Sequence, residues 1–382
     1  MLSDPPATPG ALDGILVADF SRALAGPYLT MLLSDLGAEV IKVESPGGDA
    51  TRGWGPPWHR GASTYFHAVN RDKRSVRLDL ADEGDRALAL ELGRRADVLV
   101  ENLRPGAMAR FGLGYGDLSG VNPPLVYCSI SGFGTQAAGA GIPGYDLLGQ
   151  AVGGLMSITG PVGGPPHKVG VALVDVLCGL HGAVGVLAAL AERERSGAGQ
   201  HVEVDLLSSV LSALTNQASG YLLAGVVPGP MGNAHPSLAP YESFTASDGE
   251  LVIAVGTDRQ FVQLCVALGR EDLARDPRFA TNGDRVANRG DLRDELAGTL
   301  GALTRREIVD RARPRGVPCG PVNDLSEAFA FAEEIGLEPA VRLDGDAHVR
   351  APVRLGRTPA TARRGAPALD EHGDEIRAWL RA

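Results

Sequence analysis

A regular alternation of short apolar runs with helical patterns, over residues 14–130, constrains this chain more than any other feature of its sequence. Apolar runs that predict strands occur at 14–19, 38–43, 75–80, 97–100 and 125–130, with helical patterns at 26–36 and 83–96. Strands separated by helices pair in parallel, because the returning helix must cover one face of the sheet. We therefore predict an α/β fold whose large domain is Rossmann-like, a parallel sheet with helices on both faces.

The turn after the first predicted strand departs from the usual dinucleotide-binding pattern. It reads Ser21-Arg-Ala-Leu-Ala-Gly26-Pro27, whereas the GxGxxG fingerprint brings the backbone against a pyrophosphate. The chain therefore resembles a nucleotide-binding fold without that fingerprint.

Two unusual stretches follow the first five predicted strands. Residues 132–166 are polar and rich in glycine, which is typical of an active-site loop system between apolar segments. Residues 169–190 are apolar enough to suggest a membrane span, but Asp175, His181 and several glycines interrupt them. We predict a buried core helix there, then a strand at 201–204 and a helix at 206–224.

A stretch rich in proline, glycine and asparagine at 226–236 predicts a domain boundary. Beyond it the sequence predicts a β-hairpin from 241–244 and 250–255, helices at 258–268 and 304–312, a return to the first domain at 317–322, a strand near 348–355 and a last helix at 371–381. We predict three segments: 1–225 as the first part of the large domain, 226–322 as a small α+β domain, and 323–382 as the return to the large domain.

Charge, cysteine and histidine content exclude several classes of protein. The net charge is -10 over 382 residues, with no basic run of the kind that binds nucleic acid. The four cysteines form no CxxC pair and the eight histidines no HExxH motif, so we predict neither a disulfide scaffold nor a metal site. The first 14 residues show no secretory signal, which predicts a cytoplasmic protein. The expected partners are small molecules or a second copy of the chain, with no nucleic acid and no membrane.

Lysine is rare in this chain. Only three of the 36 basic residues are lysines, Lys42, Lys73 and Lys168. Where arginine is otherwise preferred, a surviving lysine marks a position to inspect for a role, with chance survival as the alternative.

Asp175 is the leading candidate for chemistry. It is a lone carboxylate in the apolar run Gly170-Val-Ala-Leu-Val-Asp175-Val-Leu-Cys-Gly179, where burying an unpaired charge costs several kcal/mol. We predict a functional acid at this position. The alternative is that Asp175 caps a helix beginning at Val176.

A second candidate site follows the predicted strand at 97–100. Pro105 suits the first position of a helix, whose free N–H groups would face the carboxyl end of the sheet. Arg104 and Arg110 add the positive charge that a diphosphate needs in an acidic protein, and the basic run at 71–77 offers a further contact. A surface helix with solvated arginines is the alternative.

Several short motifs, in their order and spacing, carry a resemblance over nearly the whole chain. They are Asp19–Pro27, Leu36–Glu44, Asn70–Ser75, Glu101–Gly106, Ser129–Gly134, Pro143–Asp146, Gly197–Leu206, Gly232–Pro236 and Gly316–Pro321. Together they are similar to the family III CoA-transferases. The resemblance implies a Rossmann-like large domain built from both chain ends, a smaller domain between them, and an interlocked homodimer.

The resemblance also implies a reaction and a set of contacts. Asp175 would attack an acyl-CoA thioester, giving an aspartyl mixed anhydride and then an aspartyl-CoA thioester, before a free carboxylic acid takes the CoA. Loops around Gly132 and Gly160 would close over the intermediate and exclude water. No tightly bound cofactor is implied, because CoA and acyl-CoA are substrates. The implied CoA contacts are Leu24, Ala25, Leu78, Asp79, Leu80, Ala81, Asn102, Leu103, Arg104, Arg110, Gly144, Tyr145 and Asp146.

The chain departs from the oxalate-type members of that family at the adenosine end. Ser45 and Ala81 stand where those members carry an arginine and a lysine, so Arg52, Arg71 or Lys73 would have to replace them. The run of consecutive glycines that formyl-CoA transferases use as a lid is also missing, which counts against oxalate and formate as substrates.

Two other functions stay open at this stage. The same fold supports α-methylacyl-CoA racemases, whose Gly-His-Asp motif reads Gly144-Tyr145-Asp146 here, and a tyrosine suits two-base chemistry at neutral pH poorly. A catalytically silent CoA-binding protein is the other alternative. The identities of the donor and acceptor acids are not predicted.

Overall fold

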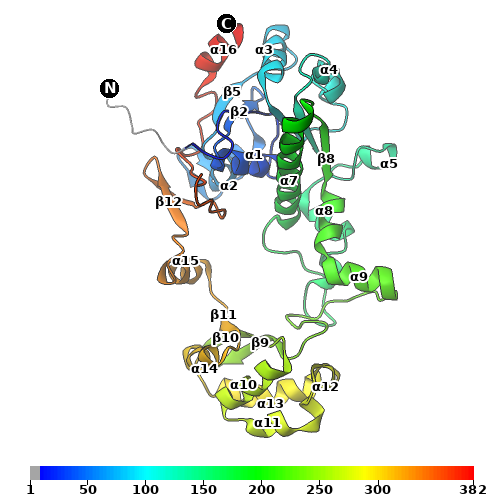
Figure 1. Ribbon diagram of the computed structural model, residues 1–382, viewed down its shortest axis with the longest axis vertical. Coiled ribbons are helices and arrows are strands. Elements are labelled where there is room, and N and C mark those ends of the chain that lie inside the picture. Colours follow the sequence, from blue (N-terminus) through cyan, green and yellow to red (C-terminus); the bar gives the residue numbers. More distant parts are fainter. Residues whose placement is uncertain (1–8) are drawn as a thin grey trace. The chain divides into compact units, whose positions relative to one another are not determined.

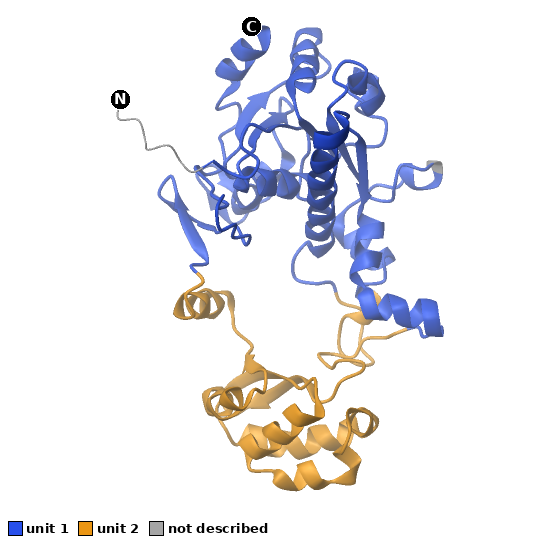
Figure 2. Cartoon of the chain, in the orientation of Figure 1, with its two compact units in different colours: residues 1–156, 168–227, 338–382 blue, residues 157–167, 228–337 orange. Residues whose placement is uncertain are grey.

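The computed structural model describes residues 9–382, which form two compact units. Unit 1 holds the residues up to 156 together with 168–227 and 338–382, and unit 2 holds 157–167 and 228–337 (Figure 2). The chain leaves unit 1 for the main part of unit 2 between residues 227 and 228 and returns to unit 1 between 337 and 338. The sequence predicted these two domain boundaries at 225/226 and 322/323. The second difference arises because the helix at 325–334 groups with unit 2.

A parallel sheet of six strands forms the centre of unit 1 (Figure 1). Its strands are β1 (Leu16–Asp19), β2 (Glu39–Glu44), β5 (Arg74–Arg77), β6 (Val98–Glu101), β7 (Val126–Ser131) and β8 (His201–Asp205). Their order is β5-β2-β1-β6-β7-β8, and every neighbouring pair is parallel. The predicted mixed α/β fold with a parallel sheet is confirmed. The strand order reverses direction between β1 and β6, which is where open sheets of this kind form a ligand crevice.

Helices cover both faces of this sheet because its strands are apolar on both sides. One face carries α1 (Ala25–Asp35), α7 (Leu173–Ser196) and α8 (Leu206–Ala213), and the other carries α3 (Glu83–Arg95), α4 (Tyr115–Ser119) and α16 (Gly373–Arg381). The core of the first face includes the fully buried side chains of Val17, Leu29 and Val186. The core of the second includes those of Ile41 and Leu92, which are almost completely buried.

The long helix α7 packs inside unit 1 although its length and composition would allow it to cross a membrane. It contacts α1, α8, β7 and β8, and 44% of its most apolar window is buried within the chain. Gly179 allows the close approach of α7 to α1, because a Cβ there would lie 2.6 Å from the carbonyl oxygen of Ala25. The predicted core helix therefore exists, shifted a few residues toward the C-terminus.

Three sequence-based expectations for unit 1 are wrong. The helix predicted at 206–224 is two helices, α8 and α9 (Thr215–Ala224), because Thr215 takes a positive φ of 39° between them. The segment after Arg104 forms turns and the short 3-10 helix Ala109–Phe111 rather than an α-helix. The strand near 348–355 is replaced by the hairpin β12 (Ala340–Leu343) and β13 (Asp346–Val349), since Pro352 beyond it has no N–H for a ladder.

The remaining short elements of unit 1 lie in its loops. They are the hairpin β3 (Trp58–His59) and β4 (Ala62–Ser63), the 3-10 helix Ala50–Gly53, and the helices α2 (Thr64–Val69), α5 (Ala137–Ala140) and α6 (Asp146–Val152).

Unit 2 combines a three-stranded antiparallel sheet with helices. The sheet contains β9 (Tyr241–Ala246), β10 (Gly249–Ala254) and β11 (Cys319–Pro321), and the helices are α10 (Asp258–Leu268), α11 (Glu271–Arg275), α12 (Asn282–Ala287), α13 (Arg289–Gly301), α14 (Arg305–Ala312) and α15 (Leu325–Glu334). The predicted hairpin and the helices at 258–268 and 304–312 are present. The predicted return to the first domain at 317–322 is wrong, because β11 pairs with β10 and completes the small sheet.

Candidate active site

Two adjoining cavities in unit 1 lie where the loops after β1 and β6 meet, at the reversal of strand order. The first, of about 310 Å³, is lined by residues 22–25, 49–50, 54, 102–105, 130–132, 140–145, 175 and 206. The second, of about 320 Å³, is lined by 20–22, 42–46, 48–50, 78–81, 103 and 111. Arg22, Asp49, Ala50 and Leu103 line both, so the two cavities form neighbouring parts of one crevice.

Most of the sequence-predicted contacts lie on this crevice. Leu24, Ala25, Asn102, Leu103, Arg104, Gly144 and Tyr145 line the first cavity together with Asp175. Leu78, Asp79, Leu80 and Ala81 line the second. Arg110, in the short 3-10 helix, and Asp146, at the start of α6, are among the lining residues of neither cavity.

The two glycine-rich loops predicted to close over an intermediate belong to different units. Gly132 lines the first cavity, whereas Gly160 lies in unit 2.

Asp175 lies in the first turn of α7 and lines the first cavity. It is partly buried, and within the described chain no hydrogen bond or ion pair engages its carboxyl oxygens. Burial, reinforced by the negative charge of Asp146, raises the pKa of Asp175 to about 7. The alternative that Asp175 caps its helix is wrong, because α7 begins at Leu173 and Asp175 is already inside it. A carboxylate near its ionisation point beside a cavity is suited to nucleophilic chemistry at neutral pH.

Asp146, and not Asp175, caps the first turn of α7. Its Oδ1 accepts hydrogen bonds from the N–H groups of Val174, at 2.8 Å, and Asp175, at 3.3 Å. Its Oδ2 accepts one from Nε2 of the fully buried Gln150, at 2.6 Å. In this structure the Asp146 carboxylate therefore contacts the backbone that carries Asp175.

The loop after β1 is held in a strained conformation at the edge of both cavities. Ala23 has a positive φ of 63°, which costs a non-glycine residue free energy unless its surroundings impose it. The side-chain amide of Asn102 clamps the preceding residue: its Oδ1 accepts from the Arg22 N–H at 2.8 Å and its Nδ2 donates to the Arg22 carbonyl at 2.7 Å. Lys42 Nζ donates to the Ser21 carbonyl at 3.0 Å. The backbone at this position is thus fixed at the edge of both cavities.

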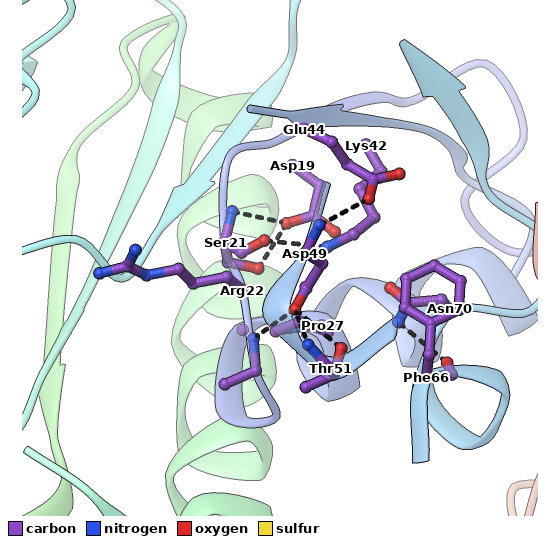
Figure 3. A network of polar contacts seen from close by, with 12 residues as sticks. Asp19, Ser21, Arg22, Pro27, Lys42, Glu44, Asp49, Thr51, Phe66 and Asn70 are labelled. Carbon is purple, nitrogen blue, oxygen red and sulfur yellow. Dashed lines mark hydrogen bonds and ion pairs between the residues drawn. The ribbon is translucent and has the colours of Figure 1, made fainter. Parts of the chain in front are cut away.

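A buried charge network lies against that loop (Figure 3). Lys42 forms an ion pair with Asp49 at 3.0 Å, and Lys73 with Asp19 at 3.0 Å. Burial alone would raise the pKa of Asp19, but the ammonium groups of Lys73 and Lys42 lower it to about 2. Burial lowers the pKa of Lys73 to about 8 against the attraction of Asp19. Removing one partner would leave a buried charge unpaired, so the network holds as a unit.

Two of the three lysines therefore have a structural reason to be lysines. Lys73 Nζ donates to Asp19 Oδ2 at 3.0 Å, to the Pro27 carbonyl at 2.9 Å and to Asn70 Oδ1 at 3.0 Å. A compact ammonium with three donors suits this arrangement, whereas a planar guanidinium does not. Lys168 is exposed and donates to the carbonyl of Val169.

Arg22 is a cation on the crevice that the sequence-based set missed. It is exposed and lines both cavities, and Figure 3 shows its side chain extending away from the buried network. The cations suggested as replacements at the adenosine end are already held in ion pairs: Arg52 with Glu44, Arg71 with Asp35, and Lys73 with Asp19. Apart from its place in the turn after the first strand, no sequence feature marked Arg22 as a candidate ligand-binding residue.

Trp54 and Tyr65 extend the site beyond the sequence-based set. Trp54 lines the first cavity, and its ring contacts that of Tyr65 edge-on at 5.4 Å between centroids. Burial and the negative charges of Asp175 and Asp146 raise the pKa of Tyr65 to about 12. Its phenol therefore stays protonated and available as a donor beside the acidic pair. The glycine- and proline-rich stretch 53–61 contains Trp54, and an aromatic residue in such a loop is the sequence feature that could have pointed to this side of the cavity.

Among the described residues, no group of three or more histidine, cysteine, aspartate or glutamate side chains is arranged to hold a metal ion.

Comparisons with known proteins match nearly the whole chain. Residues 12–373 match the profile of a family described as CoA-transferase family III. The chain is 40% identical over 391 residues to the succinate–glutarate CoA-transferase of Agrobacterium fabrum, covering 99% of this chain and 98% of that one. It is 41% identical over 381 residues to the acetyl-CoA:oxalate CoA-transferase of Acetobacter aceti, with 99% and 98% covered. A solved CAIB/BAIF family protein from Brucella suis is 42% identical, with a TM-score of 0.88 over 97% of this chain and 100% of that one.

Proposed function

The chain belongs to the family III CoA-transferases, and we propose on this basis that it moves CoA between carboxylic acids through covalent intermediates on Asp175. Its similarity to named transferases extends over almost its full length. The protein is therefore an enzyme of the CoA-transferase class that uses CoA thioesters as substrates. The single observation that carries the catalytic assignment is the unpaired, partly buried carboxyl of Asp175 beside the first cavity.

In the proposed reaction the ionised Asp175 oxygen attacks the thioester carbonyl of the donor. The carbon–sulfur bond breaks, leaving an aspartyl mixed anhydride and a CoA thiolate. The thiolate then attacks the aspartyl carbonyl, which releases the donor acid as a carboxylate and gives an aspartyl-CoA thioester. The acceptor carboxylate attacks that thioester, which expels the thiolate and gives a second mixed anhydride. The thiolate then attacks the carbonyl of the acceptor, the anhydride bond breaks, and the new acyl-CoA and the free Asp175 carboxylate are formed. Protons and electrons balance without a cofactor.

The electrostatics of the site support this use of a carboxylate. A pKa of about 7 makes Asp175 more basic than an ordinary aspartate, yet half-ionised at neutral pH. The backbone N–H groups at 131–132, which line the first cavity, are candidate donors to the oxyanion that forms during each attack.

We place CoA along the crevice with its thioester end at Asp175. The second cavity, with apolar walls from Leu78, Leu80 and Phe111, would take the adenosine. Arg22 at the junction and Arg104 in the first cavity would face the diphosphate. Pantetheine would then run through the first cavity, past the exposed ring of Tyr145, to Asp175.

We further propose that the acids exchanged are dicarboxylic acids and that the enzyme works in the cytoplasm as a homodimer. The first proposal rests on the similar transferase named for succinate and glutarate. The homodimer rests on apolar side chains left exposed on two helices of unit 1: Val184 on α7, and Leu222 and Leu223 on α9, are 66%, 76% and 87% exposed. An interlocked second copy would cover them.

The test replaces Asp175 and follows the covalent intermediates. Asp175→Ala should abolish CoA transfer between acids while CoA still binds, and mass spectrometry of the native enzyme mixed with donor should show an acyl or CoA adduct on Asp175. Substantial transfer by Asp175→Ala would refute the assignment, and an enzyme without adduct or turnover on a panel of dicarboxylates would favour a silent CoA-binding protein. Exchange of α-deuterium from heavy water into a 2-methylacyl-CoA would instead identify a racemase. None of the described residues lining the first cavity is a histidine, which favours the transferase.

A further inference from the structure

Two polar side chains connect α6 to the segment that carries Asp175. Gln150 is fully buried. Its Nε2 donates to Asp146 Oδ2 at 2.6 Å and to the Val171 carbonyl at 3.3 Å, and its Oε1 accepts from the Val169 N–H at 2.9 Å. One amide therefore holds both the Asp146 carboxylate and the loop that leads into α7.

We propose that Asp146 and Gln150 form a positioning pair that sets the orientation of the Asp175 carboxylate, and that Asp146 makes no contact with CoA. The inference rests on the proposed role of Asp175 as nucleophile. It reassigns a residue that sequence resemblance placed among the CoA contacts, and it adds Gln150, which no sequence motif singled out.

The hydrogen bonds of Asp146 carry the argument. The first N–H groups of a helix have no partner within the helix, and Asp146 Oδ1 takes two of them, those of Val174 and Asp175. Val174 is fully buried, so the turn is also fixed by packing. A hydrogen bond to the N–H of the nucleophile itself fixes the backbone from which its side chain extends. Displacing a reacting group by about 1 Å costs as much as about 100-fold in rate.

The charge of Asp146 acts on the same target. Its hydrogen-bond partners in the described chain, two backbone N–H groups and one amide, are all neutral. Its negative charge is therefore not cancelled locally and contributes to the raised pKa of Asp175. The charges of the same two carboxylates also raise the pKa of Tyr65, so its phenol stays neutral. The pair thus orients the nucleophile and keeps it basic.

A reciprocal swap tests the pair. Asp146→Asn keeps an oxygen for the two backbone N–H groups but sets an NH₂ group against Gln150 Nε2, and Gln150→Glu sets one carboxylate against another. The double variant Asp146→Asn/Gln150→Glu restores a donor opposite an acceptor. We expect each single change to lower kcat about tenfold or more with KM for acyl-CoA within about twofold, and the double variant to recover kcat to within about threefold of wild type. Gln200→Glu, which adds a charge at an exposed position, is the matched control.

Several outcomes would overturn the inference. A raised KM with unchanged kcat in Asp146→Asn would mean that Asp146 binds CoA. A double variant that folds but is no better than the worse single variant, or single variants that lose thermal stability while kcat per folded enzyme is unchanged, would make the pair merely structural. If the single variants do not fold, the double variant decides, because it restores the hydrogen bond between positions 146 and 150, although the 3.3 Å bond from Gln150 Nε2 to the Val171 carbonyl is lost in it. Asp146→Asn should also move the acidic limb of the profile of kcat against pH to lower pH, because it removes a negative charge that raises the pKa of Asp175. An acidic limb that stays at the same pH would count against the pair.

This experiment separates the inference from the function on which it rests. Residual transfer by Asp175→Ala refutes the proposed function, whereas an inactive Asp175→Ala combined with fully active single variants at 146 and 150 refutes only the positioning pair.

Discussion

Replacing Asp175 by asparagine should stabilise the folded protein at neutral and alkaline pH, although it removes the proposed nucleophile. Burial and the charge of Asp146 raise the pKa of Asp175 to about 7 in the folded chain, against an ordinary value of 3.8. Well below pH 3.8 the carboxyl is protonated in both states and contributes nothing. As pH rises, the unfolded chain releases the proton first, so the free energy of unfolding falls until the pH passes about 7, where the full cost is reached.

The size of the effect follows from the same two values. The interval from 3.8 to about 7, at roughly 1.4 kcal/mol for each pH unit, sets an upper limit of about 4 kcal/mol. Because Asp175 is partly exposed and lines a cavity, solvent screening lowers the expected difference to about 1–2 kcal/mol at alkaline pH. A neutral asparagine carries no such penalty.

The assay is denaturant unfolding of wild type and Asp175→Asn at a series of pH values and one protein concentration, since association would otherwise shift the midpoint. The stability gained by the variant should be near zero at low pH and grow through the neutral range. Asp13→Asn, at an exposed position of unit 1, makes the same chemical change without a desolvated carboxylate and serves as the control. A difference between Asp175→Asn and wild type that is flat, or that shrinks as pH rises, would refute the account of Asp175 as a desolvated acid.

Two further predictions concern the crevice and its support. Arg22→Ala should raise KM for acyl-CoA about tenfold with little change in kcat, and more than Arg110→Ala does; the reverse ranking in steady-state kinetics would restore the phosphate role to Arg110. Gly179→Ala would place a methyl group 2.6 Å from the Ala25 carbonyl oxygen and 3.2 Å from the Tyr28 ring, forcing α1 and α7 apart. We expect a loss of about 1–3 kcal/mol in unfolding free energy and a lower kcat, and an unchanged melting temperature would contradict the close packing.

The buried charge network shows why the sequence marked Lys42 and Lys73 as unusual but did not reveal what they do. Composition alone marks Lys42 and Lys73 as unusual in an arginine-rich chain. Their partners Asp49 and Asp19 are seven and 54 positions away along the chain, and only folding brings the charges together. The loss of either ammonium would leave an acidic group buried without its counter-charge.

The periodic pattern of the first 130 residues was sufficient to predict the parallel sheet and most of its strands. Alternation of strands and helices is a local property of the sequence, and burial on both faces leaves a strong apolar signal. The helix at 206–224 was predicted without its break, because a single positive φ at Thr215 leaves no mark in the hydrophobic pattern.

Sequence by itself also identified Asp175, since a lone carboxylate is conspicuous within an apolar run of residues. Only the tertiary structure decided what surrounds it. The cap from Asp146, the amide of Gln150 behind it and the cavity edge at Arg22 are set by side chains that meet across loops. Hydrogen bonds of this kind join residues with no periodic relation in the chain, so these contacts could be recognised only once the folded backbone had placed the residues together.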